Sequence, residues 1–461
     1  MALKQQKTIF ALSSAEGIAG ISVIRISGPR CKYILNKICK INGLKSRYFK
    51  YTNFLDSKNK LIDSGVVIFL QSPKSFTGED MLEFQIHGSI AGIKKMFNEL
   101  VRIKGVGYAE AGEFSRRAYI NKKNDLIGLE GLKQFIESET EAERQVAVNQ
   151  SLGSTKKIFD KWVNSLIEII SLIDAKIEFS EEDTTINETN IFQRIEGLSR
   201  EVKKSIDFSL KFKQLKSGLN ITIIGFPNAG KSSVFNFLNN EEKSIVTSIE
   251  GTTRDIISSS NDFHGTKVNL FDTAGIRNSK NLVEKKGIKK TFEISKESNK
   301  IILVLSPNNY KSRSMPFLKK LLKRKKDIII IFNKSDLKIS KYQKGKWESL
   351  IPELAKCPSI QFSCKKENLN QSNYRKLTKF ISSHLFEDKH LYKKLIFGEM
   401  RQVKHLEDCY HHLTLAKKYE KSLELASEEI KLALSDLEKL SGKIDEDKKL
   451  DYIFKNFCIG K

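Results

Sequence analysis

Gly225-Phe-Pro-Asn-Ala-Gly-Lys-Ser232 decides the fold of the central part of this 461-residue chain. The stretch reads G-x-x-x-x-G-K-S. It follows residues 220–225, an apolar run typical of a buried strand, and precedes apolar residues at helical spacing. In such a loop, backbone N–H groups turn inward and cradle phosphates at the start of the next helix. The residue types predict that Lys231 reaches the β- and γ-phosphates and that the Ser232 hydroxyl ligates Mg²⁺.

A second motif follows a predicted strand at residues 267–271. The strand ends in Asp272-Thr-Ala-Gly275. A carboxylate at Asp272 can hold Mg²⁺ through water, and the Gly275 N–H can contact the γ-phosphate. The segment therefore predicts the metal and γ-phosphate side of the same site.

The base-recognition motif follows a predicted strand at residues 328–332, which ends in Asn333-Lys-Ser-Asp336. A carboxylate accepts two hydrogen bonds from guanine N1–H and its exocyclic amine, which adenine cannot donate, so Asp336 selects GTP. Ser363, after a strand-like run at 360–362, fits the last base-contacting loop. The residues expected to contact the nucleotide are Asn228, Ala229, Gly230, Lys231, Ser232, Ser233, Thr247, Thr252, Thr253, Asp272, Thr273, Ala274, Gly275, Asn333, Lys334 and Asp336.

The hydrolytic machinery differs from that of Ras-type enzymes, which place a water-orienting glutamine after the second motif. Here that position holds Ile276, which cannot orient water. Asn228 and the segment Thr247-Ser-Ile-Glu-Gly-Thr-Thr-Arg-Asp255 offer oxygen atoms for a monovalent cation near the phosphates. Such an ion would stabilise transition-state charge much as an arginine finger does. The alternative is that Asn228 only tightens the loop.

The chain resembles the MnmE (TrmE) family of tRNA-modification GTPases over its whole length. The central region carries GFPNAGKSS, IVTSIEGTTRD, FDTAGIR, VEKKGI and NKSD in order. The N-terminal region carries VIRISG at Val23–Gly28, SFTGED at Ser75–Asp80 and GEFSRRAYINKKNDL at Gly112–Leu126, and residues 457–461 read FCIGK. The combination is specific to that family.

The resemblance implies roles for individual residues around the nucleotide. The potassium ligands would be Asn228, Thr247, Ile249 and Thr252, and the magnesium ligands would be Ser232 and Thr253. Glu284 would help to orient the hydrolytic water, and Arg254 is a further catalytic candidate.

The resemblance also implies a second site, in which Arg25, Glu83, Lys123 and Lys461 hold a tetrahydrofolate derivative. The family's reaction installs a carboxymethylaminomethyl or taurinomethyl group at C5 of the wobble uridine of certain tRNAs. It does so jointly with an FAD-dependent partner, MnmG, which supplies the FAD. The N-terminal domains of the family dimerise, so we expect a homodimer and a heterotetramer with the partner.

Cys458, in the C-terminal FCIGK sequence, is a further catalytic candidate. A thiolate brought to the folate site could attack the uracil ring or a one-carbon iminium. Simple packing of the tail is the alternative. Cys458-Ile-Gly-Lys461 suits a prenylation signal poorly, because of its glycine and its terminal lysine.

The pattern of apolar residues predicts three kinds of domain. Residues 1–120 are expected to form an α+β domain, with strands at 21–26 and 66–70. The family resemblance implies that this domain is similar to folate-binding domains and dimerises. An α/β P-loop GTPase domain of the Ras-like kind, residues 218–382, is inserted between the parts 121–217 and 383–461 of an all-α helical domain. Two apolar stripes at helical spacing are expected to form each other's core: Ile191, Ile195, Leu198, Val202 and Ile206, and Leu423, Ala426, Ile430, Ala433, Leu437 and Leu440.

Composition agrees with a tRNA partner, because the net charge is +25 and lysine and arginine neutralise phosphates. No run approaches the roughly twenty apolar residues that span a bilayer, and no signal peptide is apparent, so we expect a cytoplasmic protein without a membrane partner. The six cysteines and seven histidines show no metal-ligand spacing. Cys409, His411 and His412 are adjacent, which on a helix favours a structural role.

Two other functions share some of these features. A ribosome-assembly GTPase of the Era or Der type has the same loop motifs and a basic charge, but would carry a KH domain or a second GTPase domain. A dynamin-like GTPase would need a longer helical region and a lipid-binding loop. Neither explains SFTGED or FCIGK.

Overall fold

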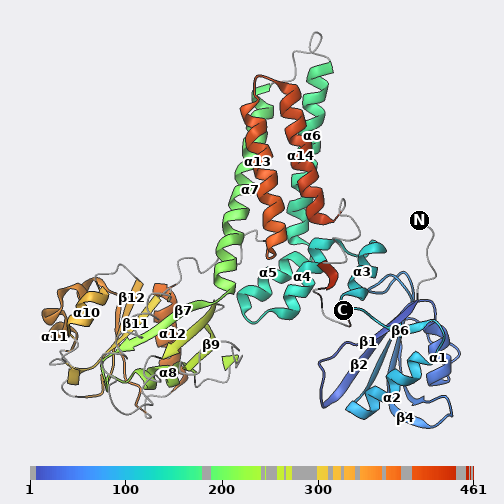
Figure 1. Ribbon diagram of the computed structural model, residues 1–461, viewed down its shortest axis with the longest axis horizontal. Coiled ribbons are helices and arrows are strands. Elements are labelled where there is room, and N and C mark those ends of the chain that lie inside the picture. Colours follow the sequence, from blue (N-terminus) through green and yellow to red (C-terminus); the bar gives the residue numbers. More distant parts are fainter. Residues whose placement is uncertain are drawn as a thin grey trace. The chain divides into compact units, whose positions relative to one another are not determined.

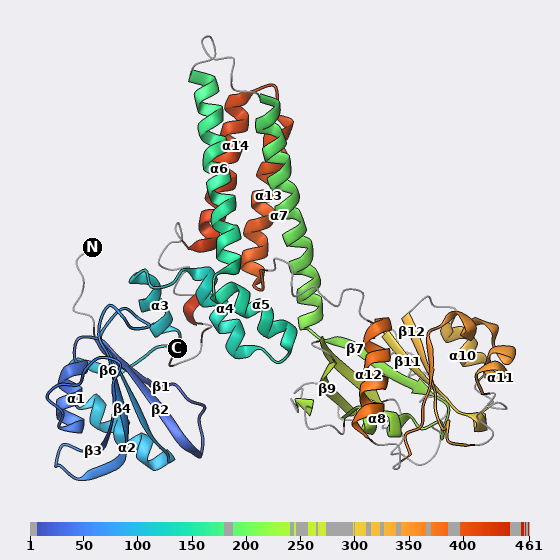
Figure 2. The same cartoon turned by 180° about the vertical axis from the view of Figure 1, so that it is seen from behind.

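The computed structural model describes residues 7–178, 188–239, 244–245, 257–263, 266–272, 298, 300–309, 315–322, 327–337, 343–365, 370–385, 397–442, 453–455, 457 and 460. The chain divides into two compact units, whose elements are labelled in Figures 1 and 2. One unit holds residues 1–136, 149–202 and 404–461, and the other holds residues 137–148 and 203–403.

A six-stranded sheet forms the N-terminal part of the first unit, with the strand order β3-β4-β5-β2-β1-β6. Only β1 and β6 pair in parallel among these neighbours. The predicted strands at 21–26 and 66–70 are confirmed as parts of β2 and β4. The strands are β1 (Thr8–Leu12), β2 (Ala19–Ser27), β3 (Phe49–Leu55), β4 (Leu61–Leu70), β5 (Met81–Gly88) and β6 (Val106–Tyr108).

Apolar side chains pack on both faces of this sheet. Successive side chains of a strand point to opposite faces, so neighbours in β1 belong to different layers. Phe10 of β1 belongs to the core that α1 (Cys31–Cys39) and α2 (Ile90–Val101) form on one face. Its neighbours Ile9 and Ala11 belong to a separate cluster with Phe114 of α3 (Glu113–Ile120). The strand β1 therefore lies between two apolar layers, as the expected α+β fold requires.

Long helices make up the rest of the first unit (Figure 1). The predicted apolar stripe on α7 is buried, and the one on α14 is buried except for the half-buried Leu423. The most extensive contact of α14 is with α6. That the two stripes pack against each other stays a prediction. The helices are α4 (Leu126–Glu137), α5 (Glu141–Ser151), α6 (Ser154–Glu178), α7 (Glu188–Lys216), α13 (Met400–Lys418) and α14 (Leu423–Ser441). Most of α5 and the part of α7 after residue 202 belong to the second unit.

Polar contacts tie these helices together at their edges. Trp162 of α6 donates its Nε1–H to Glu201 of α7 at 2.9 Å. Ser427 of α14 donates to Asp174 of α6 at 2.9 Å.

No helix among the described residues combines the length and the apolar character that a membrane crossing requires.

A seven-stranded sheet organises the second unit, in the order β13-β12-β11-β7-β10-β9-β8. The strands from β13 to β10 are parallel, and β9 and β8 are antiparallel to their neighbours. The strands are β7 (Leu219–Gly225), β8 (Ser244–Ile245), β9 (Ile257–Phe263), β10 (Thr266–Asp272), β11 (Lys300–Leu305), β12 (Asp327–Phe332) and β13 (Ser359–Gln361). The parallel strands β11 and β12 are apolar throughout their buried length, as expected for strands covered on both faces.

Helices flank this sheet, and α8 (Lys231–Asn239) contacts both β7 and β10. It also contacts α12 (Gln371–Leu385), and Figure 2 shows the two helices on the same side of the sheet. The unit further contains α10 (Met315–Leu322) and α11 (Gln343–Leu350). Since α6 and α7 precede this domain and α13 and α14 follow it, the α/β domain is inserted into the helical domain, as predicted.

Candidate functional site: a phosphate-binding loop and a second polar site

The loop between β7 and α8 requires both of its glycines. A Cβ atom on Gly225 would lie 2.3 Å from the carbonyl oxygen of Val304 on β11, and one on Gly230 would lie 2.0 Å from Nδ2 of Asn333. Gly230 and Asn228 also have positive φ angles, of 96° and 58°. The spacing of the motif thus encodes a backbone that passes too close to its neighbours to carry side chains at those two points.

The side chains of the loop lie where the sequence predicts a phosphate site. Lys231 begins α8 and is only 7% exposed, and its Nζ donates to the carbonyl oxygen of Phe226 at 3.0 Å within the same loop. Ser232 and Ser233 are exposed on the first turn of the helix. A helix N-terminus with a buried ammonium group beside it favours an anion.

The base-recognition motif is held directly against this loop. Asn333 donates through Nδ2 to the carbonyl oxygen of Ala229 at 2.9 Å. Gln343 of α11 donates to the carbonyl oxygens of Asn333 and Leu305, both at 3.3 Å. No sequence pattern indicated Gln343, because its role depends on where α11 lies.

The predicted guanine-binding carboxylate is oriented by its expected neighbour. Ser363 Oγ donates to Asp336 Oδ1 at 2.6 Å, and this hydrogen bond holds the pKa of the exposed Asp336 carboxyl below its usual value. The backbone N–H of Ser335 donates to Phe362 at 3.1 Å, and Lys334 has a φ of 61°. The motifs at 225–232, 333–336 and 363 therefore come together at the carboxyl ends of β7, β12 and β13.

Asp272 is the last residue of β10, opposite Ile223 of β7. The remaining predicted residues near the nucleotide lie outside the described residues, as do two of the predicted residues of the tail. They are Thr247, Ile249, Thr252, Thr253, Arg254, Thr273, Ala274, Gly275, Ile276 and Glu284, together with Cys458 and Lys461.

A second polar site lies on the N-terminal sheet. Arg25 of β2 stands directly opposite Glu83 of β5, and its Nε and Nη2 donate to Glu83 Oε1 at 3.0 and 2.8 Å. The two side chains are 19% and 20% exposed. Arg25 Nη1 also donates to the carbonyl oxygen of Gly460 at 3.3 Å.

The C-terminal segment is anchored there by a further contact. Ser13 Oγ donates to the same Gly460 carbonyl oxygen at 2.9 Å. Gly460 has a φ of 91°, and a Cβ on it would lie 2.4 Å from the carbonyl oxygen of Leu12. The tail therefore reaches Arg25 through a glycine, and Ser13 is a site residue that sequence reasoning did not identify.

Lys123, the third predicted folate ligand in the described part of the chain, contacts a different segment. Its side chain is exposed and lies over Gly78, where an added Cβ would be 3.1 Å from Lys123 Cγ. Its backbone N–H donates to Ala118 at 2.8 Å. The structure thus brings together Arg25, Glu83 and the tail, and it joins Lys123 to the Ser75–Asp80 loop.

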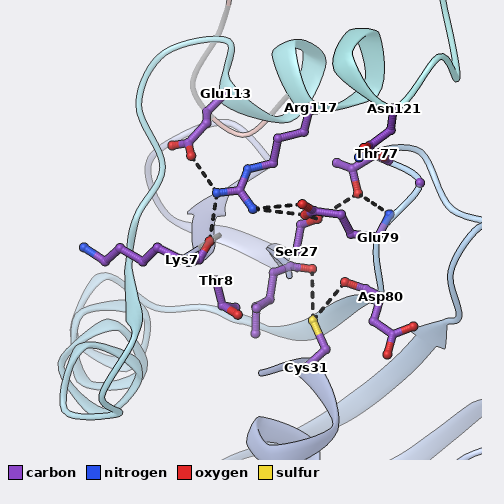
Figure 3. Close-up of polar contacts among 12 residues, drawn as sticks. Lys7, Thr8, Ser27, Cys31, Thr77, Glu79, Asp80, Glu113, Arg117 and Asn121 are labelled. Atoms are coloured by element: carbon purple, nitrogen blue, oxygen red, sulfur yellow. Dashed lines mark hydrogen bonds and ion pairs between the residues drawn. The ribbon is translucent and has the colours of Figure 1, made fainter. Parts of the chain in front are cut away.

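A buried ionic network joins the SFTGED loop to α3 (Figure 3). Arg117 of α3 is only 7% exposed, and it donates to Glu79 Oε2 at 3.0 Å and to Glu113 Oε1 at 2.8 Å. Ser27 donates to Glu79 Oε2 at 2.6 Å, and Asn121 donates to the Thr77 carbonyl oxygen at 2.7 Å. The three N-terminal sequence motifs are therefore parts of one hydrogen-bonded structure.

These features define a class of protein: a P-loop nucleotide-binding protein whose α/β domain is inserted in a helical domain and follows an α+β domain. The family model described as GTP-binding protein TrmE N-terminus matches residues 8–123, and the model described as MnmE helical domain matches residues 126–458. The chain belongs to the MnmE family of tRNA modification GTPases.

Relatives named tRNA modification GTPase MnmE match it from end to end. The Rickettsia prowazekii protein is 35% identical over 99% of this chain and 100% of its own length. The Aliarcobacter butzleri protein is 33% identical over the same shares of the two chains. Among solved structures, the G domain of the T. maritima FeoB iron transporter matches 36% of this chain and 98% of its own, with 19% identity and a TM-score of 0.27.

Proposed function

We propose that this protein is a GTP-hydrolysing tRNA modification enzyme. With an FAD-dependent partner of the MnmG type, it adds a carboxymethylaminomethyl-type group to C5 of the wobble uridine of certain tRNAs, using a one-carbon unit from tetrahydrofolate. The observation that carries the proposal is the 35% identity over 99% of the chain to a tRNA modification GTPase. The geometry of the phosphate-binding loop supports the GTPase half.

In the nucleotide site, Lys231 would give up its hydrogen bond to the Phe226 carbonyl oxygen and contact the β- and γ-phosphates instead. Ser232, on the first turn of α8, would hold Mg²⁺ together with Thr253. Bound Mg²⁺ would neutralise charge that develops on the phosphates. Asp336 would accept from guanine N1–H and its amine, and Ser363 keeps that carboxylate oriented and ionised.

Hydrolysis is proposed to depend on potassium, because Ile276 cannot orient water. The exposed Asn228, with its left-handed backbone, suits a ligand position, and Thr247, Ile249 and Thr252 would complete the set. A bound K⁺ would stabilise transition-state charge. Glu284 would orient the water, with Arg254 as a further catalytic candidate.

The second site is proposed to hold the folate. The Arg25 guanidinium suits an anionic group, and the Glu83 carboxylate suits N–H donors of a pterin ring. Lys123 and Lys461 would complete the site. Gly460 contacts Arg25, and this supports the proposal that Cys458 of the same tail acts as a nucleophile on the uracil ring or a one-carbon iminium.

A homodimer joined through its N-terminal domains, bound to the MnmG-type protein in a heterotetramer, is the proposed assembly, with a cytoplasmic location. The net charge of +25 supports tRNA binding.

The first test is the GTPase rate of the purified protein in KCl against NaCl, over a range of protein concentrations. We expect strong potassium stimulation that rises with concentration, and its loss on Asn228→Ala. Equal rates in the two salts would contradict the cation site.

The second test is nucleoside analysis of tRNA from a deletion strain. Loss of the modified wobble uridine supports the proposal. Unchanged nucleosides with a defect in ribosome assembly would favour the Era or Der type of function instead.

A further inference from the structure

A cluster of histidine and carboxylate side chains joins α13 to α14, on residues that neither site uses. His405 and Asp408 are three positions apart on α13 and therefore lie on one face of that helix, while Asp436 comes from α14. One possible ligand atom of each residue lies within 4.8 Å of those of the other two. The three residues converge from two helices, although they are separated by up to thirty-one positions in the sequence.

Asp436 is the centre of this cluster. It is only 5% exposed, and a buried carboxylate needs compensation of its charge. Its Oδ1 accepts from Lys439 Nζ at 2.7 Å, and its Oδ2 lies 3.6 Å from His412 Nε2. The Lys439 side chain is 37% exposed, so it can swing into solvent if another cation takes over the compensation.

His412 extends the cluster on the same face of α13. Its Nδ1 lies 2.7 Å from Glu429 Oε2 on α14. A proton on Nδ1, donated to Glu429, would leave the Nε2 lone pair directed towards Asp436, an arrangement that recurs in metal-binding histidines. In a zinc site with bonds of about 2.0–2.2 Å, adjacent ligand atoms lie about 3–3.6 Å apart. The separation of 3.6 Å between His412 Nε2 and Asp436 Oδ2 fits a cation between them.

We propose that His405, Asp408 and Asp436 bind a divalent transition-metal ion. His412 lies near Asp436 but outside the group whose atoms are all within 4.8 Å of one another, and it would become the fourth ligand by a movement of its side chain. Imidazole nitrogen together with carboxylate oxygen favours Zn²⁺ over Mg²⁺, which prefers oxygen ligands alone. The bound ion clamps α13 to α14. Cys409 and His411, which are close to His412 in the sequence, are not part of the proposed ligand set. Cys409 is fully buried, and burial raises the pKa of its thiol, while His411 is exposed.

The test is titration of the full-length, chelator-treated protein with ZnCl₂ by calorimetry, with Mg²⁺ in excess so that magnesium sites stay filled. We expect wild type to bind one equivalent that His405→Ala and Asp436→Asn bind at least tenfold more weakly. His411→Ala is the matched control on the same helix and should bind as wild type does. Substitution with Co²⁺ should give a visible spectrum without a thiolate charge-transfer band.

Equal stoichiometry and affinity in wild type and His405→Ala would overturn the proposal, and so would a thiolate band in the Co²⁺ spectrum. If His405→Ala does not fold, His405→Gln replaces it, and the readout is the rise in melting temperature on adding Zn²⁺. That rise should occur in wild type and His411→Ala and be absent from His405→Gln. A rise of equal size in all three proteins would also refute the site.

Discussion

The two candidate sites of this protein are built in opposite ways. The nucleotide site is assembled from short motifs at neighbouring strand ends, and its link between Asn333 and Ala229 spans 104 positions. The Arg25 site depends on a contact between Ser13 and Gly460, which are 447 positions apart. A site of the first kind can be read from motif order, whereas a site of the second kind exists only once the chain has folded.

The largest expected effect concerns the network that supports the N-terminal site. Replacing the buried Arg117 by Met leaves the half-buried Glu79 and Glu113 without their cation, which costs at most about 3–5 kcal/mol. Hydrogen exchange of peptides from 75–121 should lose protection, while the GTPase rate stays unchanged. An equal loss in both readouts would show that the two sites are not independent.

Arg102→Met is the matched control for that substitution. Arg102 is 62% exposed, and its partner Glu99 keeps Lys95 as a second cation. We expect the free energy of unfolding to fall by less than about 1 kcal/mol. If Arg102→Met lost as much protection from hydrogen exchange as Arg117→Met, the network around Arg117 would be no more important for stability than an exposed ion pair.

The second prediction addresses the nucleotide site. Gly230→Ala would push a Cβ to 2.0 Å from Asn333 Nδ2, at a φ of 96°. The displaced loop should lower kcat/KM for GTP by about a hundredfold or more, because N–H groups aimed at the phosphates are lost. Gly345→Ala on the exposed helix α11 has open space and should leave kcat/KM unchanged. Wild-type activity of Gly230→Ala would mean that the loop can relax around a side chain.

A smaller effect is expected at the base. Asp336→Asn removes a charged acceptor, and such hydrogen bonds contribute about 1.5–3 kcal/mol. GTP affinity should fall about tenfold to a hundredfold, and XTP affinity should rise because the amide can donate to the xanthine oxygen. Competition binding with GTP and XTP measures the two affinities. Asp327→Asn, an exposed carboxylate at the start of β12, should change neither affinity.

The smallest effect tests the long-range contact. Ser13→Ala removes one neutral hydrogen bond to the Gly460 carbonyl, a loss of about 0.5–1.5 kcal/mol. Binding of 5-formyltetrahydrofolate should weaken about twofold to tenfold in calorimetry. Ser64→Ala on β4, whose hydroxyl bonds to Asn53, should bind as wild type does. If Ser13→Ala bound this ligand as wild type does, the tail would not contribute to the proposed folate site.

Much of the nucleotide site could be predicted because its residues are tied to motifs. The predicted strands ending at Gly225, Asp272 and Phe332 are confirmed by β7, β10 and β12. The central strand β11 was not predicted, since it ends in no motif, although its Val304 is what makes Gly225 necessary. Gln343 was missed for the same reason: its partners are backbone atoms of other segments.

The N-terminal site and the helical domain were harder to predict. The family resemblance pointed to Arg25 and Glu83, and their pairing follows from the register of β2 and β5. Nothing in the sequence indicated that Ser13 would contact Gly460 or that α14 would lie against α6. Apolar periodicity shows that a helix has a buried face, but it does not say which helix covers that face.

The contact of Ser13 with Gly460 can form only late in the synthesis of the protein, because the two residues are 447 positions apart. A ribosome adds about 5–20 residues per second, so about 20–90 s separate the emergence of the two residues. The N-terminal sheet can form early in that interval, but the anchored tail arrives only after the GTPase domain and its flanking helices have been made. A chain interrupted during translation would therefore carry a nucleotide-binding loop without a finished second site.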